Sequence, residues 1–198
     1  MTEITPAERA RGRRKVLLLA AIFFLPVAVS FALYYGGLRP QDSAAKGELI
    51  QPTRTLEIVG LRHHDGSAAG EETLRQKWSI VYIGDGGCDE ACETALTYGR
   101  QSRLALGKDM DRVQRVFLST GNCCDRDYLD TEQRGIVALD ASSPEAAKLL
   151  AQFPGERARS VYVVDPLGNL VMRHDADHVV NKDLLTDLKK LLKLSHIG

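Results

Sequence analysis

Two cysteines, Cys88 and Cys92, stand four residues apart in the stretch "GDGGCDEAC", directly after the apolar run "WSIVYI". Residues four apart lie on the same face of a helix, so a helix that begins here directs both sulfur atoms at one point. Such a pair can be a structural disulfide, a redox couple or two ligands for a soft metal ion such as Cu(I). The spacing alone leaves all three open.

The charges around this pair act on the thiols in opposite directions. The amide dipoles at a helix N-terminus favour the thiolate, which is the form that binds a metal or attacks a disulfide. Nearby negative charge raises the pKa of a thiol, and four carboxylates flank the pair: Asp85, Asp89, Glu90 and Glu93. We therefore expect a metal site or a structural disulfide rather than a strongly activated redox cysteine.

A second pair of cysteines, Cys123 and Cys124, is adjacent in the stretch "GNCCDRD". Neighbouring Cα atoms are about 3.8 Å apart, whereas bridged cysteines usually need a wider separation. A bond between these two would therefore close a strained ring. Alternatively, one of them pairs with Cys88 or Cys92, or fills the core as a small apolar side chain.

Two histidines near the C-terminus, His174 and His178, are spaced i, i+4. This is a metal-ligand spacing if both residues lie on a helix. The alternative is a solvated loop between a strand and a helix. We keep both residues as candidate ligands.

The order of secondary-structure elements indicates which parts of the chain position these side chains. The hydrophobic patterns predict strands, helices and one hairpin in the following order: strand 55–61, strand 77–83, a helix from Asp89, strand 113–120, strand 135–140, helix 142–153, hairpin 160–174 and helix 181–194. This order predicts an α/β fold, a thioredoxin-like three-layer sandwich.

The predicted topology brings the candidate ligands together. A helical crossover between strands 77–83 and 113–120 makes them parallel, so their carboxyl ends share one edge of the sheet. The hairpin then returns the chain to the same edge with its second strand. Because ligands of open α/β sheets bind at this edge, we expect the four cysteines, His174 and His178 to converge there.

The N-terminus has the pattern of a membrane anchor. Five basic residues between 9 and 15 precede an uncharged apolar run over residues 16–35. Twenty helical residues span about 30 Å, the thickness of the hydrocarbon core of a bilayer, and the basic cluster places the N-terminus in the cytoplasm. A cleavable signal peptide, with Ser30–Ala32 as a weak cleavage site, is the alternative.

The chain is thus expected to have four parts: a cytoplasmic basic N-terminus (1–15), a single transmembrane helix (16–35), a tether (36–46) and an exported domain (47–198). Both readings of the N-terminus export the domain to a compartment that permits disulfides. The 198 residues contain 26 basic and 26 acidic side chains. A net charge of zero gives no support to nucleic-acid binding, which needs a concentrated basic face.

The motifs resemble those of a known family. An exported thioredoxin-like domain with CxxxC after its first core strand resembles the Sco/SenC family, as do "VQRVFLSTGNCCDRD" and "SVYVVDPLGNLV". The resemblance implies copper-binding thiols, Cys88 and Cys92, and a role in cytochrome c oxidase assembly. The stretches "YIGDGGCDEAC" and "DPLGNLVMRH" are more closely similar to proteobacterial inner-membrane proteins associated with cytochrome c oxidase, which implies a periplasmic domain.

One element of the Sco/SenC pattern is missing. The family's third copper ligand is a histidine about five residues before the hairpin tyrosine, and counting back from Tyr162 reaches Arg157. Copper binding would then need a substitute ligand, such as His174, His178 or the pair Cys123 and Cys124, or a site made of two thiolates. The family's two cysteine ligands correspond to Cys88 and Cys92, and its histidine ligand has no counterpart in this sequence.

Three functions are compatible with the sequence. The first is an anchored accessory protein that handles copper or metal-site thiols for a respiratory oxidase, with an oxidase subunit or other assembly factors as partners. The second is an enzyme, a thiol–disulfide oxidoreductase, against which the CxxxC spacing and the acidic flanks count. The third is a non-catalytic scaffold in which the cysteines are structural.

Overall fold

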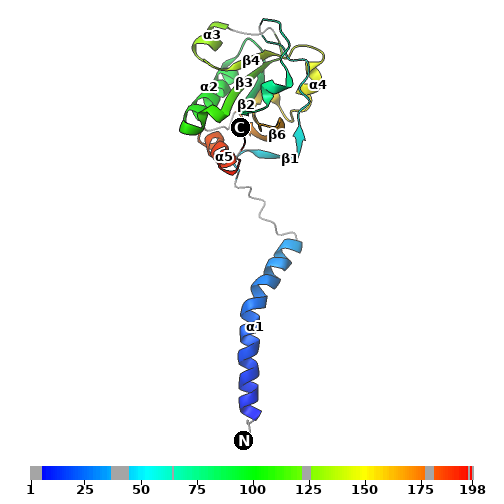
Figure 1. The fold of residues 1–198 in the computed structure, drawn as a ribbon, viewed down its shortest axis with the longest axis vertical. Helices are drawn as coiled ribbons and strands as arrows, with labels where there is room; N and C mark the ends of the chain where they lie inside the picture. Colours follow the sequence, from blue (N-terminus) through cyan, green and yellow to red (C-terminus); the bar gives the residue numbers. More distant parts are fainter. Residues whose placement is uncertain are drawn as a thin grey trace. The chain divides into compact units, whose positions relative to one another are not determined.

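The computed structural model describes residues 6–36, 45–63, 65–121, 126–176, 181–195 and 197. The chain divides into two compact units, Met1–Ser43 and Ala44–Gly198. The first unit consists of one helix, and the second contains the sheet and the remaining helices (Figure 1).

The helix of the first unit, α1, runs from Pro6 to Tyr35. It covers the whole run expected to be helical and begins ten residues earlier. Its segment Gly12–Tyr35 is long and apolar enough to cross a membrane, although a signal sequence has the same properties. Pro26 lies inside the helix, and the Ser30 hydroxyl donates a hydrogen bond of 2.8 Å to the Pro26 carbonyl. Proline has no N–H, so the Ile22 carbonyl four residues earlier loses its helical donor, a cost that membrane-spanning helices tolerate.

In the described part of the second unit, six strands form one mixed sheet in the order β1-β6-β5-β2-β3-β4. The strands are β1 Glu48–Thr55, β2 Trp78–Gly84, β3 Val113–Ser119, β4 Val137–Asp140, β5 Ser160–Val164 and β6 Asn169–Asp175. Strands β2, β3 and β4 are parallel, and β5 runs antiparallel to both β2 and β6. The predicted parallel pair and the predicted hairpin are therefore confirmed.

Helices cover both faces of this sheet. Besides α1, the described helices are α2 Glu90–Leu104, α3 Arg126–Thr131, α4 Ala146–Leu150 and α5 Asn181–Leu194, with 3-10 turns η1 Glu71–Leu74, η2 Gly107–Arg112 and η3 Arg157–Arg159. Helices α2 and α5 lie on one face and α4 on the other (Figure 1). The domain therefore has the predicted three layers.

The central strand β2 shows why its sequence is a continuous apolar run. All seven residues are buried, because the strand has a helical layer on each side. Ile80 and Tyr82 belong to the core beneath α2 and α5. Val81 and Ile83 alternate with them and belong to the core on the α4 side. Alternating side chains of one strand thus contribute to two separate cores.

The hairpin between β5 and β6 is closed by an aspartate. One oxygen of Asp165, Oδ1, accepts hydrogen bonds from the backbone N–H groups of Leu167 (2.9 Å) and Asn169 (2.8 Å). Gly168 has a φ of +87°, a left-handed conformation that favours glycine. The sequence Asp-Pro-Leu-Gly-Asn therefore encodes the turn directly.

Two predicted elements are wrong in part. The strand expected at residues 55–61 is a loop, and the edge strand β1 lies just before it in the sequence. Leu56, Ile58 and Leu61 nevertheless pack into the core on the α4 side, so the apolar residues of this segment reflect burial without strand pairing. The helix expected at 142–153 is limited to α4, although the Ser143 hydroxyl does accept a hydrogen bond from the Ala146 N–H (3.0 Å) at its start.

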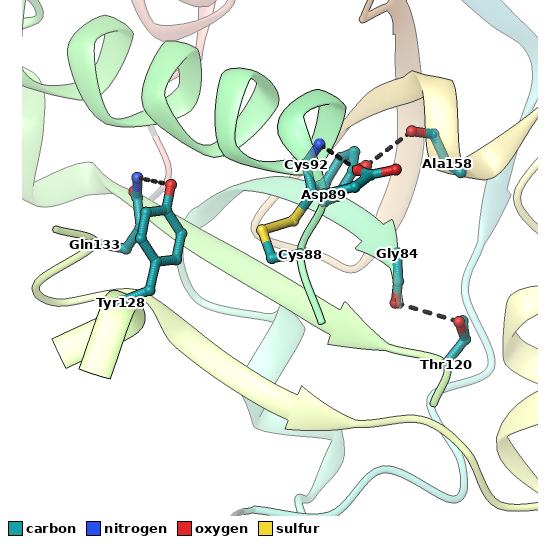
Figure 2. Close-up of a disulfide and its surroundings, with 9 residues drawn as sticks. Gly84, Cys88, Asp89, Cys92, Thr120, Tyr128, Gln133 and Ala158 are labelled. Atoms are coloured by element: carbon teal, nitrogen blue, oxygen red, sulfur yellow. Dashed lines mark hydrogen bonds between the residues drawn. A yellow bond between two sulfur atoms is a disulfide. The ribbon is translucent and has the colours of Figure 1, made fainter. Parts of the chain in front are cut away.

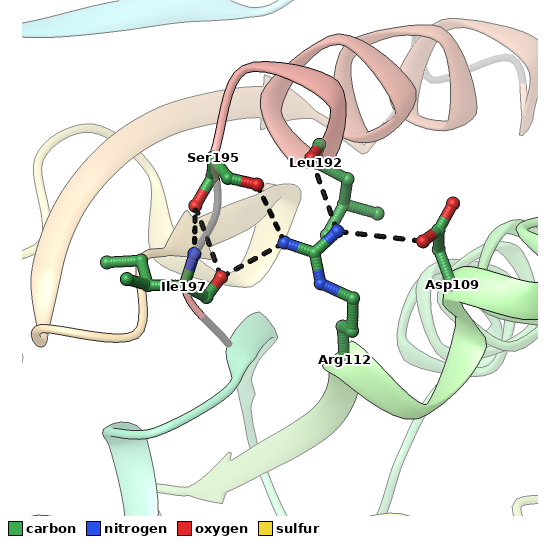
Figure 3. Close-up of polar contacts among 5 residues, drawn as sticks. All are labelled: Asp109, Arg112, Leu192, Ser195 and Ile197. Carbon is green, nitrogen blue, oxygen red and sulfur yellow. Dashed lines mark hydrogen bonds and ion pairs between the residues drawn. The ribbon is translucent and has the colours of Figure 1, made fainter.

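The end of α5 is capped by an arginine from another part of the chain (Figure 3). The guanidinium of Arg112 donates hydrogen bonds to the carbonyls of Leu192 (3.2 Å), Ser195 (2.9 Å) and Ile197 (3.1 Å). Its Nη1 also lies 3.6 Å from Asp109 Oδ1. A cation at this position satisfies carbonyls that the helix itself leaves without donors and complements the negative end of the helix dipole.

We expect Arg112→Ala to lower the free energy of unfolding of the second unit by about 1–2 kcal/mol, because it removes charge-assisted hydrogen bonds that are partly exposed to solvent. Urea denaturation of residues 44–198 measures this. Lys108→Ala, a change at an exposed residue of the same 3-10 turn, is the matched control and should cost less than about 0.5 kcal/mol. Equal losses in the two variants would contradict the capping role.

Candidate functional site

The loop that carries the first cysteine pair leaves β2 at the carboxyl edge of the parallel strands. The Gly84 carbonyl accepts hydrogen bonds from the backbone N–H (2.9 Å) and the hydroxyl (3.2 Å) of Thr120, which follows β3. The Cys88 N–H then donates to the Asp85 carbonyl (3.2 Å), and Cys88 has a left-handed φ of +43°. This tight turn reverses the chain directly above the ends of β2 and β3 (Figure 2).

Helix α2 begins immediately after this turn, as predicted from its acidic first residues. Asp89 is the N-cap, and its Oδ1 accepts a hydrogen bond of 3.0 Å from the Cys92 N–H. An aspartate at this position both satisfies a free amide and complements the positive end of the helix dipole. The cap thereby fixes Cys92 in the first turn of the helix.

The structure joins the two cysteines in a disulfide, with their Cα atoms 5.1 Å apart (Figure 2). Cys92 is 2% exposed and belongs to the core between α2 and the sheet, whereas Cys88 is half-buried at the rim. The two sulfur atoms meet as expected, but Cys88 precedes the N-cap of α2, so the left-handed turn before the helix, rather than a shared helix face, brings it to Cys92. Cys92 is held in the core, and Cys88 is less deeply buried.

A buried tyrosine, Tyr82, supports the site from below. Its hydroxyl donates a hydrogen bond of 2.8 Å to the carbonyl of Ala158 in η3. Burial, and to a smaller extent the carboxylate of Asp89, raises the pKa of Tyr82 to about 12. Tyr82 therefore stays protonated and holds η3 beside the start of α2, so Arg157 lies in a segment that borders the cysteine pair.

The second cysteine pair, Cys123 and Cys124, lies outside the described residues. The chain that enters this segment is described: the Ser119 hydroxyl donates to the Gly121 carbonyl (2.7 Å), and a Cβ on Gly121 would overlap with Oδ1 of Asp85. A side chain at position 121 would meet the Asp85 carboxylate, because the loop after β3 lies directly against the loop that precedes Cys88.

The chain that leaves this segment forms α3, which sequence reasoning missed. Tyr128 of α3 packs on the same core cluster as Cys88. The Gln133 side-chain N–H donates a hydrogen bond of 3.0 Å to the Tyr128 hydroxyl, and the two residues lie on the opposite side of the disulfide from Ala158 (Figure 2). Helix α3 spans only Arg126–Thr131, which is too short for its periodicity to stand out in the sequence.

His174 is at the predicted edge of the sheet but faces a different partner. It lies in β6 opposite Val161, which in turn lies opposite Tyr82. At about 4.8 Å for each strand, His174 is about 10 Å from Tyr82 across the sheet. Its side chain is 4% exposed, so the alternative of a solvated loop is wrong, and its position in a strand rules out a helical pair with His178, which lies outside the described residues.

The imidazole of His174 is held beneath the first residues of the domain. Its Nε2 lies 3.6 Å from Oδ2 of Asp187 in α5, and a Cβ on Gly47 would approach this nitrogen to 2.7 Å. The same Asp187 oxygen accepts hydrogen bonds from the backbone N–H groups of Lys46 and Gly47, both at 2.8 Å. Asp187 thus fixes the start of β1 on α5 and covers His174.

The described residues contain no group of three histidine, cysteine, aspartate or glutamate side chains that could hold a metal ion. Within the described part of the chain, Cys88 and Cys92 are therefore the soft donors that lie together. For His174 to serve as a ligand, its ring would have to leave Asp187. The role of the candidate ligands stays a prediction.

Two comparisons of the sequence relate this geometry to known proteins. Residues 78–195 match the family model described as "Transmembrane-like, thioredoxin-like, C-terminal domain". A protein of Stutzerimonas stutzeri named "Putative copper-binding protein" is 24% identical over 171 residues, which make up 81% of this chain and 81% of that protein. The family model covers β2 to the end of α5 and therefore the whole cysteine site.

Solved structures of Sco proteins share the fold. Apo Sco1 from Thermus thermophilus superimposes with a TM-score of 0.60 at 20% identity, over 76% of this chain and 99% of that chain. Yeast Sco1 with copper bound gives a TM-score of 0.58 at 18% identity, over 76% of this chain and 94% of that chain. At these identities the likeness shows the fold, and the predicted thioredoxin-like class is confirmed.

The buried histidine predicts a pH dependence of stability. Burial lowers the pKa of His174 below its ordinary value of 6.5, against the opposite effect of Asp187 and Asp183. The unfolded chain therefore takes up this proton at a higher pH than the folded chain. Stability from this group is complete above about pH 6.5 and decreases as the pH falls through the lowered pKa.

We expect His174→Gln to flatten the decline in the free energy of unfolding between about pH 7 and pH 5, because it removes a group that must charge in the interior. Urea denaturation at a series of pH values measures the slope. His63→Gln, which removes a histidine from the loop between β1 and η1, is the control and should keep the wild-type slope. An unchanged slope in His174→Gln would contradict the assignment.

Proposed function

The chain belongs to the family described as "Transmembrane-like, thioredoxin-like, C-terminal domain", and from this premise we propose that it is a membrane-anchored accessory protein that handles copper, or the thiols of a copper site, during assembly of a respiratory cytochrome c oxidase. The observation that carries the proposal is the joined pair Cys88 and Cys92 at the start of α2. The copper named for the relative from Stutzerimonas stutzeri and the copper bound to yeast Sco1 support it.

The proposed location follows from α1. A single segment, residues 16–35 of the apolar part of α1, crosses the bacterial inner membrane, with the five basic residues between 9 and 15 in the cytoplasm. The sheet domain then lies in the periplasm, where disulfides form and persist. An oxidase subunit or another assembly factor is the proposed partner at the membrane.

The oxidised pair must be reduced before it can bind copper. A dithiol reductant supplies two electrons and two protons, the bond between the two sulfur atoms breaks, and the reductant leaves as a disulfide. The two thiols of Cys88 and Cys92 then lose their protons as they take up Cu(I), the soft ion that thiolates select. The N-terminal amides of α2 favour the resulting negative charge.

Two sulfur atoms are enough to bind Cu(I). Other parts of the chain can supply further ligands. Cys123 and Cys124 follow Gly121, which touches Asp85 of the cysteine loop. His178 is a further candidate in the chain after β6, and His174 becomes one only when its contact with Asp187 opens. We propose the sulfur pair as the primary site and these residues as additional ligands.

A thiol–disulfide oxidoreductase is the second candidate. The difference in burial between half-exposed Cys88 and buried Cys92 favours it, because an attacking thiol must be reached by its partner while the second thiol resolves the mixed disulfide. This function predicts that the reduced chain transfers its electrons to a protein disulfide without any copper. The copper function predicts tight, stoichiometric binding of Cu(I).

We expect the full chain, in detergent and after mild reduction, to bind about one Cu(I), and the double change Cys88→Ser and Cys92→Ser to abolish tight binding, because it removes both soft donors. A competition titration against a Cu(I) chelator measures the affinity. The matched control is Cys123→Ser with Cys124→Ser, which removes the same number of thiols.

The control also reports on the additional ligands. A smaller loss of affinity in the second double variant would assign one of its cysteines to the site, and no loss would confine the site to Cys88 and Cys92. Equal affinities in the wild type and both double variants would contradict a copper site at these cysteines.

A further inference from the structure

A positive charge is buried beneath α2. Arg115, in the middle of β3, is 4% exposed. Its Cδ lies 3.9 Å from the position that a Cβ on Gly99 would occupy, so the side chain passes beneath α2 at this glycine. Burial, together with the cations of Arg103 and Arg100, lowers the pKa of Arg115 to about 10, and the group therefore stays charged at neutral pH.

The guanidinium of Arg115 is held by neutral groups. It donates to the side-chain oxygen of Gln133 (2.7 Å) and to the carbonyls of Gln133 (3.1 Å) and Arg134 (2.7 Å). No carboxylate among the described residues forms an ion pair with it. Buried charges are usually paired, whereas Arg115 has only neutral hydrogen-bond partners among the described residues.

The position of Arg115 relates this charge to the cysteine pair. Cys92 precedes Gly99 by seven residues on α2, which corresponds to about 10 Å along the helix. Arg115 and Tyr82 line one small cavity beneath α2. Arg115 also fixes the orientation of the Gln133 amide, because Arg115 has only donors. The amide N–H then donates to Tyr128, which packs against the same core cluster as Cys88.

We propose that Arg115 is a positioning residue for the cysteine pair. The buried charge of Arg115 favours the negative charge that Cys88 and Cys92 carry as two thiolates, alone or around Cu(I). The copper part of this inference rests on the proposed function; the part that concerns the reduced pair does not. At about 10 Å and an effective dielectric constant of about 20, a unit positive charge favours each unit of negative charge on the pair by about tenfold. The acidic side chains around the pair are exposed, so solvent screens their opposing effect.

One substitution separates the charge of Arg115 from its role as an anchor. Gln133→Glu keeps the shape of the side chain and the oxygen that accepts from Arg115, but it places a compensating negative charge beside the guanidinium. The Tyr128 hydroxyl can donate to the new carboxylate, so the contact with α3 is kept as well. Lys108→Gln, which removes an exposed charge at the opposite edge of the sheet, is the matched control.

The experiment uses the full chain in detergent and two readouts. The reduction potential of the metal-free pair is measured at pH 8 against a dithiothreitol redox buffer, and the Cu(I) affinity by competition titration. We expect Gln133→Glu to weaken Cu(I) binding about tenfold and to lower the potential by about 30 mV for each thiolate that the reduced pair carries, the two-electron equivalent of that factor. Lys108→Gln should change neither value, and thermal unfolding should show that Gln133→Glu is as stable as the wild type.

Two substitutions of Arg115 itself complete the test. Arg115→Lys keeps the charge with fewer hydrogen bonds and should retain the wild-type potential, whereas Arg115→Met should lower it. Unchanged potentials in Gln133→Glu and Arg115→Met would overturn the inference. If none of the proteins binds Cu(I), the proposed function fails, and the order of the metal-free potentials still decides the role of Arg115.

Discussion

The parallel pairing of β2 with β3 is the constraint on which the rest of the domain depends. Seven residue pairs, from Trp78–Val113 to Gly84–Ser119, align the two strands over their whole length. Their carboxyl ends consequently meet at one edge, and the hydrogen bonds from Thr120 to Gly84 join the two loops that leave it. Each of the two cysteine pairs follows one of these strands in the sequence. The position of the site therefore depends on strand pairing rather than on the loops themselves.

At this edge, the buried start of α2 lies beside a half-buried cysteine. Tyr82 and Cys92 belong to the interior, Asp89 caps α2, and Cys88 remains half-buried in a left-handed turn. Buried polar groups around the rim have defined partners: Tyr82 donates to Ala158, and Arg115 donates to Gln133. This arrangement fixes the helix end and leaves Cys88 less deeply buried than Cys92, which the proposed exchange of a metal ion or of electrons requires.

Much of this fold could be predicted from the sequence, because the elements β2, α2, β3, β5, β6 and α5 have strong periodicity, a cap or a turn signal. The loop after Thr55 resembles a strand in sequence because Leu56, Ile58 and Leu61 make it a short apolar segment, although it packs on the core as a loop. Helix α3 and the burial of Arg115 had no signal in the sequence. The partner of His174 could not be predicted either, because Asp187 comes from a helix whose placement depends on tertiary packing.

The most direct test of the copper site is X-ray absorption spectroscopy of the reduced full chain loaded with one equivalent of Cu(I). A first coordination shell that contains the sulfur atoms of Cys88 and Cys92, and that loses sulfur in the Cys88→Ser, Cys92→Ser variant, is the expected result. A shell of nitrogen and oxygen alone, or a sulfur shell that the double variant keeps unchanged, would contradict it.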